Sequence, residues 1–142
     1  MRKNLFDASA IMLLAKNHPE EAHERLKDEY LLDITLYEIG NAVWKIYKLL
    51  RKPDKDAALE SIEQVHRLAA LMIKHEAIDR RAHIAIMDNA FQYNLTYYDS
   101  AYLTAARESK LTLITEDEQL AKAARRANVP TRNVNALFLT NV

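Results

Sequence analysis

The chain has 142 residues, 20 basic and 20 acidic side chains, and a formal charge of zero. It has no cysteine and a single glycine, Gly40, which excludes thiolate chemistry, zinc knuckles, disulfide scaffolds and glycine-rich phosphate loops. The length fits one domain over residues 1–142, large enough to bury a core without a metal or disulfide. Because the charge is balanced, a polyanionic partner must be bound by a local patch or through metal ions.

The N-terminus and the hydropathy pattern predict a protein that stays out of membranes. Asp7 lies too close to the start of the chain for a signal peptide. No stretch approaches the roughly 18 uncharged apolar residues of a membrane span. We therefore expect a soluble, cytoplasmic protein with no membrane partner.

Short segments rich in β-formers alternate with amphipathic helical segments along the chain. Strands are expected at residues 5–6, 30–35, 76–78, 111–115 and 131–134. Helices are expected at residues 8–16, 19–27, 35–50, 56–74, 80–93, 100–109 and 118–127. Thr35 is predicted to be a helix N-cap, and Glu38 three residues later completes a capping box. The alternation predicts an α/β fold, with a parallel sheet flanked by helices on both faces.

Four acids, called the acidic quartet below, fall where predicted strands or apolar segments end. Asp7 follows the first strand, and Asp117 lies just past the strand at 111–115. Glu38 lies in the first turn of the helix after the second strand, and Asp99 follows two tyrosines and opens a helix. In an open parallel sheet, the carboxyl ends of the strands share one rim, where ligands bind. We therefore expect the quartet to project into one cleft.

Such a cluster of carboxylates predicts a metal site. Carboxylates that share a cleft raise one another's pKa, and a bound cation removes the repulsion. Oxygen ligands without His or Cys suit hard ions such as Mg²⁺ or Mn²⁺. One such ion acidifies a water, and a pair also holds the leaving oxygen of a phosphoryl displacement. The residues thus predict metal-assisted phosphodiester hydrolysis without a protein nucleophile, with one ion or two.

A purely structural interpretation competes with this one. Asp is a favoured helix N-cap, and Asp7, Asp99 and Asp117 each precede a predicted helix. Glu38 would complete a capping box without any chemical role. The apolar residues before the acids favour the functional interpretation, because they bring the acids to the ends of buried segments on one side of one sheet.

The acidic quartet stands in four motifs spread over nearly the whole chain. They are Leu-Phe-Asp-Ala-Ser-Ala at Asp7, Tyr-Glu-Ile-Gly-Asn-Ala-Val-Trp-Lys at Glu38, Tyr-Tyr-Asp-Ser-Ala-Tyr-Leu-Thr-Ala-Ala at Asp99, and Leu-Ile-Thr-Glu-Asp-Glu-Gln-Leu at Asp117. In this order the motifs resemble the PIN domain, and within it the VapC-like toxin ribonucleases of prokaryotic toxin–antitoxin pairs.

The resemblance implies a five-stranded parallel sheet, a Mg²⁺ or Mn²⁺ site and endoribonuclease activity. It matches the acidic quartet to the family's catalytic and metal-binding acids. It matches Thr115 to a supporting hydroxyl and Asn41 to a polar position that orients Glu38. Glu116 is a rival to Asp117 for direct contact with the metal. Relatives form homodimers and are inhibited by a small antitoxin that covers the cleft, so the implied partners are RNA, an antitoxin and a second copy of the chain.

Aromatic and basic residues near the quartet have two interpretations each. Tyr97, Tyr98 and Tyr102 are predicted to pack around the helix that carries Asp99, and stacking on RNA bases is the alternative. The basic residues between Lys45 and Lys52 are predicted to be a solvated helix end, and contact with RNA phosphates is the alternative.

Two rival functions fit the same fold class. A phosphotransfer receiver domain also carries acids at its strand ends, but it needs an acid pair near the first strand and a Lys after a late strand. Here a single Asp7 ends the first strand, and no Lys follows Thr131. A non-catalytic RNA-binding or partner-binding module stays open, and failure to bind Mn²⁺ would favour it.

Overall fold

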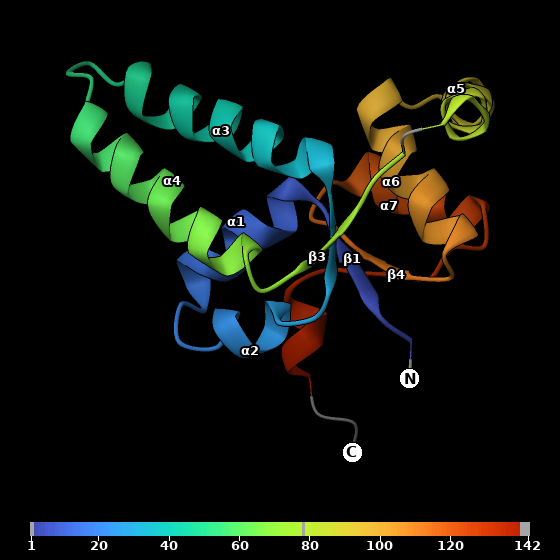
Figure 1. Cartoon of the computed structure of the whole chain (residues 1–142), viewed down its shortest axis with the longest axis horizontal. Coiled ribbons are helices and arrows are strands. Elements are labelled where there is room, and N and C mark those ends of the chain that lie inside the picture. The colour runs from blue at the N-terminus through green and yellow to red at the C-terminus, as the bar shows by residue number, and fades with distance from the viewer. Residues whose placement is uncertain (1, 78, 140–142) are drawn as a thin grey trace.

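The computed structural model describes residues 2–77 and 79–139, and its core is a five-stranded parallel sheet (Figure 1). The strands are β1 Asn4–Phe6, β2 Tyr30–Leu32, β3 Ile73–His75, β4 Thr112–Ile114 and β5 Thr131–Arg132. The helices are α1 Ala8–Asn17, α2 Ala22–Leu26, α3 Asp33–Lys48, α4 Lys55–Ala69, α5 Arg80–Tyr93, α6 Tyr97–Glu108 and α7 Glu118–Arg126, followed by a 3-10 helix at Asn135–Phe138. The predicted α/β fold with five parallel strands is confirmed.

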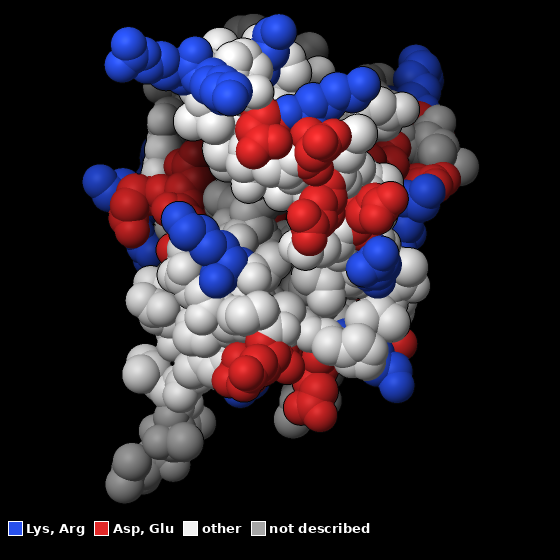
Figure 2. Space-filling model, turned by 90° about the vertical axis from the view of Figure 1, so that its left-hand side faces the viewer, with Lys and Arg blue, Asp and Glu red and all other residues white. Residues whose placement is uncertain are grey.

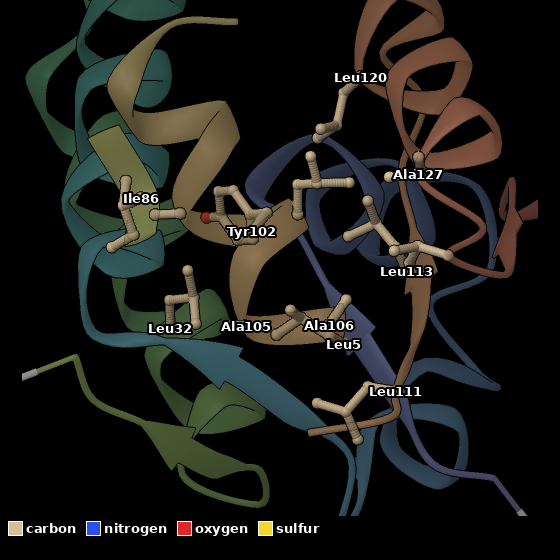
Figure 3. Close-up of a cluster of buried hydrophobic side chains, with 14 residues drawn as sticks. Leu5, Leu32, Ile86, Tyr102, Ala105, Ala106, Leu111, Leu113, Leu120 and Ala127 are labelled. Carbon is tan, nitrogen blue, oxygen red and sulfur yellow. The ribbon is translucent and has the colours of Figure 1, made fainter. Parts of the chain in front are cut away.

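The central strands divide the core into two layers, one on each face of the sheet. In β1, Leu5 joins a cluster with α5, α6 and α7 (Figure 3), whereas Phe6 joins a cluster with α1, α2, α3 and α4. In β4, Leu113 and Ile114 divide in the same way. Successive strand residues point to opposite faces, so strands covered on both sides need the uninterrupted apolar sequences found here. Helices therefore cover both faces, as predicted.

The order of the strands places a crevice at the carboxyl ends of β1 and β4. The order is β3-β2-β1-β4-β5, and Leu5 pairs with Leu113 across the central ladder. The chain builds β2 and β3 on one side of β1, then crosses to build β4 and β5 on the other. Ligands of open parallel sheets bind at such a reversal, beyond the carboxyl ends of the strands. The residues that follow β1 and β4 begin with Asp7 and Thr115.

Helix α3 begins earlier than the sequence predicted. Its N-cap is Leu32, so Thr35 is the third residue of the helix and the predicted N-cap at Thr35 is wrong. The Thr35 hydroxyl is fully buried and accepts a hydrogen bond from the Leu32 N–H at 3.0 Å. The N–H of the N-cap residue Leu32 is bonded to Thr35, so Glu38 does not complete a capping box. The carboxylate of Glu38 is therefore free to make contacts outside the helix.

Strand β3 also lies earlier than predicted, at Ile73–His75 rather than 76–78, and residue 78 is outside the described part of the chain. Helix α4 ends at Ala69, although the apolar periodicity of the sequence continues through Met72. The position of β3 is fixed by its pairing with β2, in which Tyr30 is paired with Ile73 and Leu32 with His75. That constraint is tertiary and leaves no local signal.

Helices α3 and α4 form an antiparallel hairpin that projects beyond the sheet (Figure 1). They bury Ile39, Val43 and Val65 in the core layer that also contains α1. Helix α3 has 16 residues. Within residues 2–77 and 79–139, no helix combines the length and the apolar character needed to cross a membrane.

Candidate active site

A cleft of about 700 Å³ opens beyond the carboxyl ends of β1 and β4, between α1, α3 and α6. All four members of the acidic quartet line it, as the sequence predicted. Ser9, Asn41, Lys45 and Tyr98 are among the other residues of its wall. The structure therefore brings together four acids that lie up to 110 residues apart in sequence, and we call this hollow the acidic cleft.

Asp7 is the most buried of the four acids in the acidic cleft, with 6 % of its surface exposed. It is the N-cap of α1, and one carboxylate oxygen accepts hydrogen bonds from the Ala10 N–H at 2.9 Å and the Ser9 hydroxyl at 2.7 Å. The other oxygen accepts a hydrogen bond from the Thr115 hydroxyl. Burial raises the pKa of Asp7 and the charge of Asp99 adds to the rise, while the three hydrogen bonds oppose it. Asp7 is thus both a helix cap and a strongly held carboxylate of the cleft.

Glu38 is half-buried and is held from across the cleft by Tyr102. The Tyr102 hydroxyl donates to a Glu38 carboxylate oxygen at 2.6 Å and lies 2.7 Å from the Thr35 hydroxyl. Figure 3 shows the Tyr102 ring inside the core layer of α5, α6 and α7. Burial raises the pKa of Glu38, the hydrogen bond from Tyr102 lowers it, and the charges of Asp7 and Asp99 raise it. Burial and the neighbouring Glu38 carboxylate raise the pKa of the Tyr102 hydroxyl, which keeps it a donor.

Asp99 and Asp117 come from the N-terminal ends of α6 and α7. Thr96, not Asp99, is the N-cap of α6, and its side chain accepts a hydrogen bond from the Asp99 N–H at 3.1 Å. The Asp99 carboxylate therefore has no capping role. Burial and the charge of Asp117 raise its pKa. Asp117 is the N-cap of α7, accepts a hydrogen bond from the Leu120 N–H at 3.0 Å, and is exposed.

The supporting residues predicted from the sequence lie in different places. Thr115 is buried and links two acids. Its hydroxyl donates to the Asp7 carboxylate, and its oxygen accepts a hydrogen bond from the Asp117 N–H at 3.0 Å. Asn41 lines the acidic cleft one turn after Glu38. The Glu116 carboxylate instead accepts a hydrogen bond from the Val134 N–H at 2.8 Å, and it lines a separate groove beside α1 and α3. Of the two rivals, Asp117 lines the acidic cleft and Glu116 does not.

The acidic cleft fits a hard divalent cation by its chemistry. Its potential ligands are carboxylate oxygens, and charge repulsion within the quartet contributes to the raised pKa of three members. Among the described residues, no three acidic, His or Cys side chains already stand in the geometry of a metal site. Mg²⁺ commonly uses only one or two carboxylates, with waters and substrate phosphate oxygens as its other ligands. An open arrangement of four acids is compatible with that mode of binding.

Sequence reasoning missed several residues that shape the acidic cleft. It assigned no role to Ser9, which ties Asp7 to the turn after β4 because its oxygen accepts the Glu116 N–H at 3.1 Å. It placed Tyr102 in packing or base stacking and missed its bond to Glu38. The spacing of Tyr102 three residues after Asp99 places it on the same helix face as that acid, but it does not identify Glu38 as its partner. Tyr37 also lines the cleft beside Glu38, and the sequence predicted no role for it.

An open parallel sheet with an oxygen-only acidic cleft at its reversal point defines a class of α/β domain suited to a hard cation and an anionic ligand. Residues 5–126 match the sequence model of the PIN domain, and the chain therefore belongs to the PIN domain family. This result confirms the resemblance stated from the four motifs.

Named relatives and a solved structure are similar over most of the chain. The protein named Exonuclease VapC9 from Pyrobaculum aerophilum is 34 % identical over 117 residues, which are 82 % of this chain and 81 % of the relative. Ribonuclease VapC3 of the same organism is 28 % identical over 131 residues, which are 84 % of this chain and 93 % of the relative. The crystal structure of PAE2754 from Pyrobaculum aerophilum has a TM-score of 0.77 at 26 % identity and covers 96 % of this chain and 92 % of its own.

Proposed function

We propose that this protein is a divalent-metal-dependent endoribonuclease, the toxin of a toxin–antitoxin pair, and that the acidic quartet is its catalytic and metal-binding site. The observation that carries the proposal is the convergence of four carboxylates, from four segments of the chain, on one cleft. Relatives named as a ribonuclease and an exonuclease support nuclease chemistry. The family as a whole supports a divalent metal.

The acids of the cleft and the hydroxyls that hold them have different roles in this function. Asp7, Glu38, Asp99 and Asp117 would hold Mg²⁺ or Mn²⁺, which would supply positive charge at the phosphate and lower the pKa of a water. The hydroxyls of Ser9 and Thr115 fix the carboxylate of Asp7, and Tyr102 fixes that of Glu38. The chain has no Cys and no G-x-S-x-G nucleophile elbow, and we infer that a water activated by the metal is the attacking group.

The protein partners implied by the resemblance are part of the proposal. Large apolar side chains are exposed along the α3–α4 hairpin, and such surfaces mark contacts with other proteins. They include Trp44, Leu49, Leu50 and Leu59. We assign this hairpin to a contact with the antitoxin or with a second copy in a homodimer. The mass in solution of the wild type and of Leu49→Ser/Leu50→Ser, measured by light scattering, tests whether the hairpin forms the dimer.

The test of the activity is incubation of purified protein with a linear and a circular single-stranded RNA of the same sequence, with Mg²⁺ or Mn²⁺. An endonuclease cuts both substrates, whereas an exonuclease leaves the circle intact. Comparing the two ions decides which one supports turnover. Mapping of the cut ends is expected to show 5′-phosphate and 3′-hydroxyl products.

Matched variants connect the activity to the acidic cleft. Asp99→Asn is expected to abolish cleavage, and Asp88→Asn, a change at an exposed acid of α5, is expected to keep it. If Asp7→Asn and Asp99→Asn both retained metal-dependent cleavage, the assignment of the site would be wrong.

A non-catalytic binding module is the second candidate. The observation in its favour is that, within the described residues, no three ligands are prearranged for a metal. Isothermal titration with Mn²⁺ separates the two candidates. Binding that is lost in Asp99→Asn supports the nuclease, and no binding up to millimolar Mn²⁺ together with no cleavage supports the binding module.

A further inference from the structure

Two tyrosines stand on different helices in the wall of the acidic cleft. Tyr37 belongs to α3 and Tyr98 to α6, and each immediately precedes a member of the quartet, Glu38 or Asp99. They are 84 % and 58 % exposed. Exposed aromatic rings in the wall of a cleft offer flat apolar surfaces on which a ligand can pack.

The other two tyrosines of this region already have partners inside the protein. The Tyr102 hydroxyl is bonded to Glu38, and its ring is buried. The Tyr97 hydroxyl lies 2.5 Å from a ring nitrogen of His83, and the two rings are stacked at 6.1 Å. Tyr37 and Tyr98 are thus the tyrosines of the acidic cleft whose ring faces are available to a ligand.

The charge around the cleft offers RNA little electrostatic attraction. The chain has no net charge, and acidic and basic side chains are interspersed on the face shown in Figure 2. Among the residues that line the cleft, Lys45 is the one Lys or Arg against four acids. A bound ion offsets part of that negative charge but does not hold the neighbouring nucleotides. Stacking on aromatic rings binds single-stranded bases without needing positive charge.

We propose that Tyr37 and Tyr98 stack the two bases that flank the scissile phosphate, so that the RNA must be unpaired on both sides of the cut. The inference rests on the nuclease function proposed above. In a duplex, both faces of each base are covered by neighbours, and neither ring could stack on them. The acids and their ion would act on the phosphate between two bases held apart by the walls of the cleft.

The test is a thermodynamic cycle that combines variants of the protein with changes in the RNA. The substrate is a short single-stranded RNA that contains a mapped cleavage site, and the matching substrates lack the base immediately 5′ or 3′ of the cut. Tyr37→Ala and Tyr98→Ala are each expected to raise KM about 5- to 140-fold, the value of one stacked base, with a much smaller change in kcat. Removing the partner base should cost the wild type about as much and should cost the corresponding Ala variant nothing further.

Three further measurements make the result specific. Tyr37→Phe and Tyr98→Phe keep the ring, and their KM values are expected to lie close to that of the wild type. Phe91→Ala removes an aromatic side chain that is 83 % exposed on α5, which does not line the cleft, and is expected to keep the wild-type KM. Thermal melting confirms that each Ala variant is folded, as expected for exposed side chains.

The outcomes separate this inference from the function on which it rests. If the wild type cleaves RNA and both Ala variants keep its KM, the tyrosines do not stack bases and the nuclease assignment is unaffected. The inference is also overturned if, for both abasic substrates, the effect of removing the base is as large in the Ala variant as in the wild type. The removed ring and the removed base were then not in contact. If the wild type cleaves no RNA, both proposals are wrong.

Discussion

Two strand-to-helix junctions place acids in the same cleft by different means. At the β1–α1 junction, Asp7 is the N-cap, and two of its three hydrogen-bond partners, Ser9 and Ala10, lie within three residues. At the β2–α3 junction, the N-cap is Leu32 without a side-chain cap, and Glu38 lies in the second turn. Its hydrogen-bond partner, Tyr102, is 64 residues away. The first carboxylate is held by two partners in its own turn and one distant partner, Thr115, whereas the second is positioned by the tertiary fold alone.

The largest expected effect is the loss of activity when either junction loses its charge. Asp7→Asn and Glu38→Gln keep the shape of the side chain but remove a proposed metal ligand. Loss of an outer partner of a metal ligand costs about 10- to 100-fold in activity or metal affinity, so we expect these variants to lose more than about 100-fold in kcat/KM. The measurement is cleavage of a fluorescent RNA at saturating Mn²⁺. Activity in Asp7→Asn within tenfold of the wild type would contradict its role.

The next effect distinguishes the supports of the two acids. Thr115→Val removes a hydroxyl from buried Asp7, and Tyr102→Phe removes one from half-buried Glu38. Each is expected to lower activity by about 10- to 100-fold. Water can replace the lost partner only at Glu38, so Thr115→Val is expected to cost more free energy of unfolding, about 1–3 kcal/mol.

Matched controls outside the acidic cleft keep this comparison interpretable. Thr112→Val changes another buried Thr, the first residue of β4, which does not line the acidic cleft, and Tyr93→Phe removes a hydroxyl at the end of α5. Both are expected to retain wild-type activity. Denaturant unfolding measures the free energy of each variant, and equal costs for Thr115→Val and Tyr102→Phe would show that the two carboxylates are equally accessible to water.

A smaller effect concerns the pH dependence of stability without metal. The pKa values of Asp7, Glu38 and Asp99 are raised in the folded state, chiefly by burial, from ordinary values of 3.8, 4.5 and 3.8. Below about pH 4 these groups are largely protonated in both the folded and the unfolded state, and they destabilise the folded state least. Their charged forms oppose folding increasingly as the pH rises through the raised pKa values.

Thermal melting in EDTA between pH 4 and 8 tests this sign. Other carboxylates also titrate in this range, so the informative quantity is the difference between the wild type and Asp99→Asn. We expect the variant to gain stability relative to the wild type as the pH rises, and Mn²⁺ to reverse the order, since it binds the intact quartet better. A difference that is independent of pH would contradict the raised pKa of Asp99.

The two junctions also show how far sequence reasoning reaches in this molecule. Local patterns predicted β1, β2, β4 and the positions of the acids. In these places an apolar strand is followed directly by an acid or by the start of a helix, so neighbouring residues carry the signal. The start of α3 was predicted wrongly because Thr35, a typical N-cap residue, is the third residue of the helix and accepts a hydrogen bond from the Leu32 N–H. The position of β3 was predicted wrongly because it is fixed by pairing with β2. The bond from Tyr102 to Glu38 joins two helices, and no spacing rule connects residues 64 positions apart.

The smallest expected effect concerns Glu116, which the sequence could not separate from Asp117. The Glu116 carboxylate accepts the Val134 N–H at 2.8 Å, outside the acidic cleft, whereas Asp117 lines the cleft and caps α7. Gln keeps an oxygen that accepts the same hydrogen bond, so Glu116→Gln is expected to change kcat/KM by less than threefold. Asp117→Asn, which also preserves the cap, is expected to lower it by more than about 100-fold, as for the other proposed ligands. If the two variants exchanged these outcomes, the turn after β4 would have to rearrange when metal binds, and Glu116 would be the ligand.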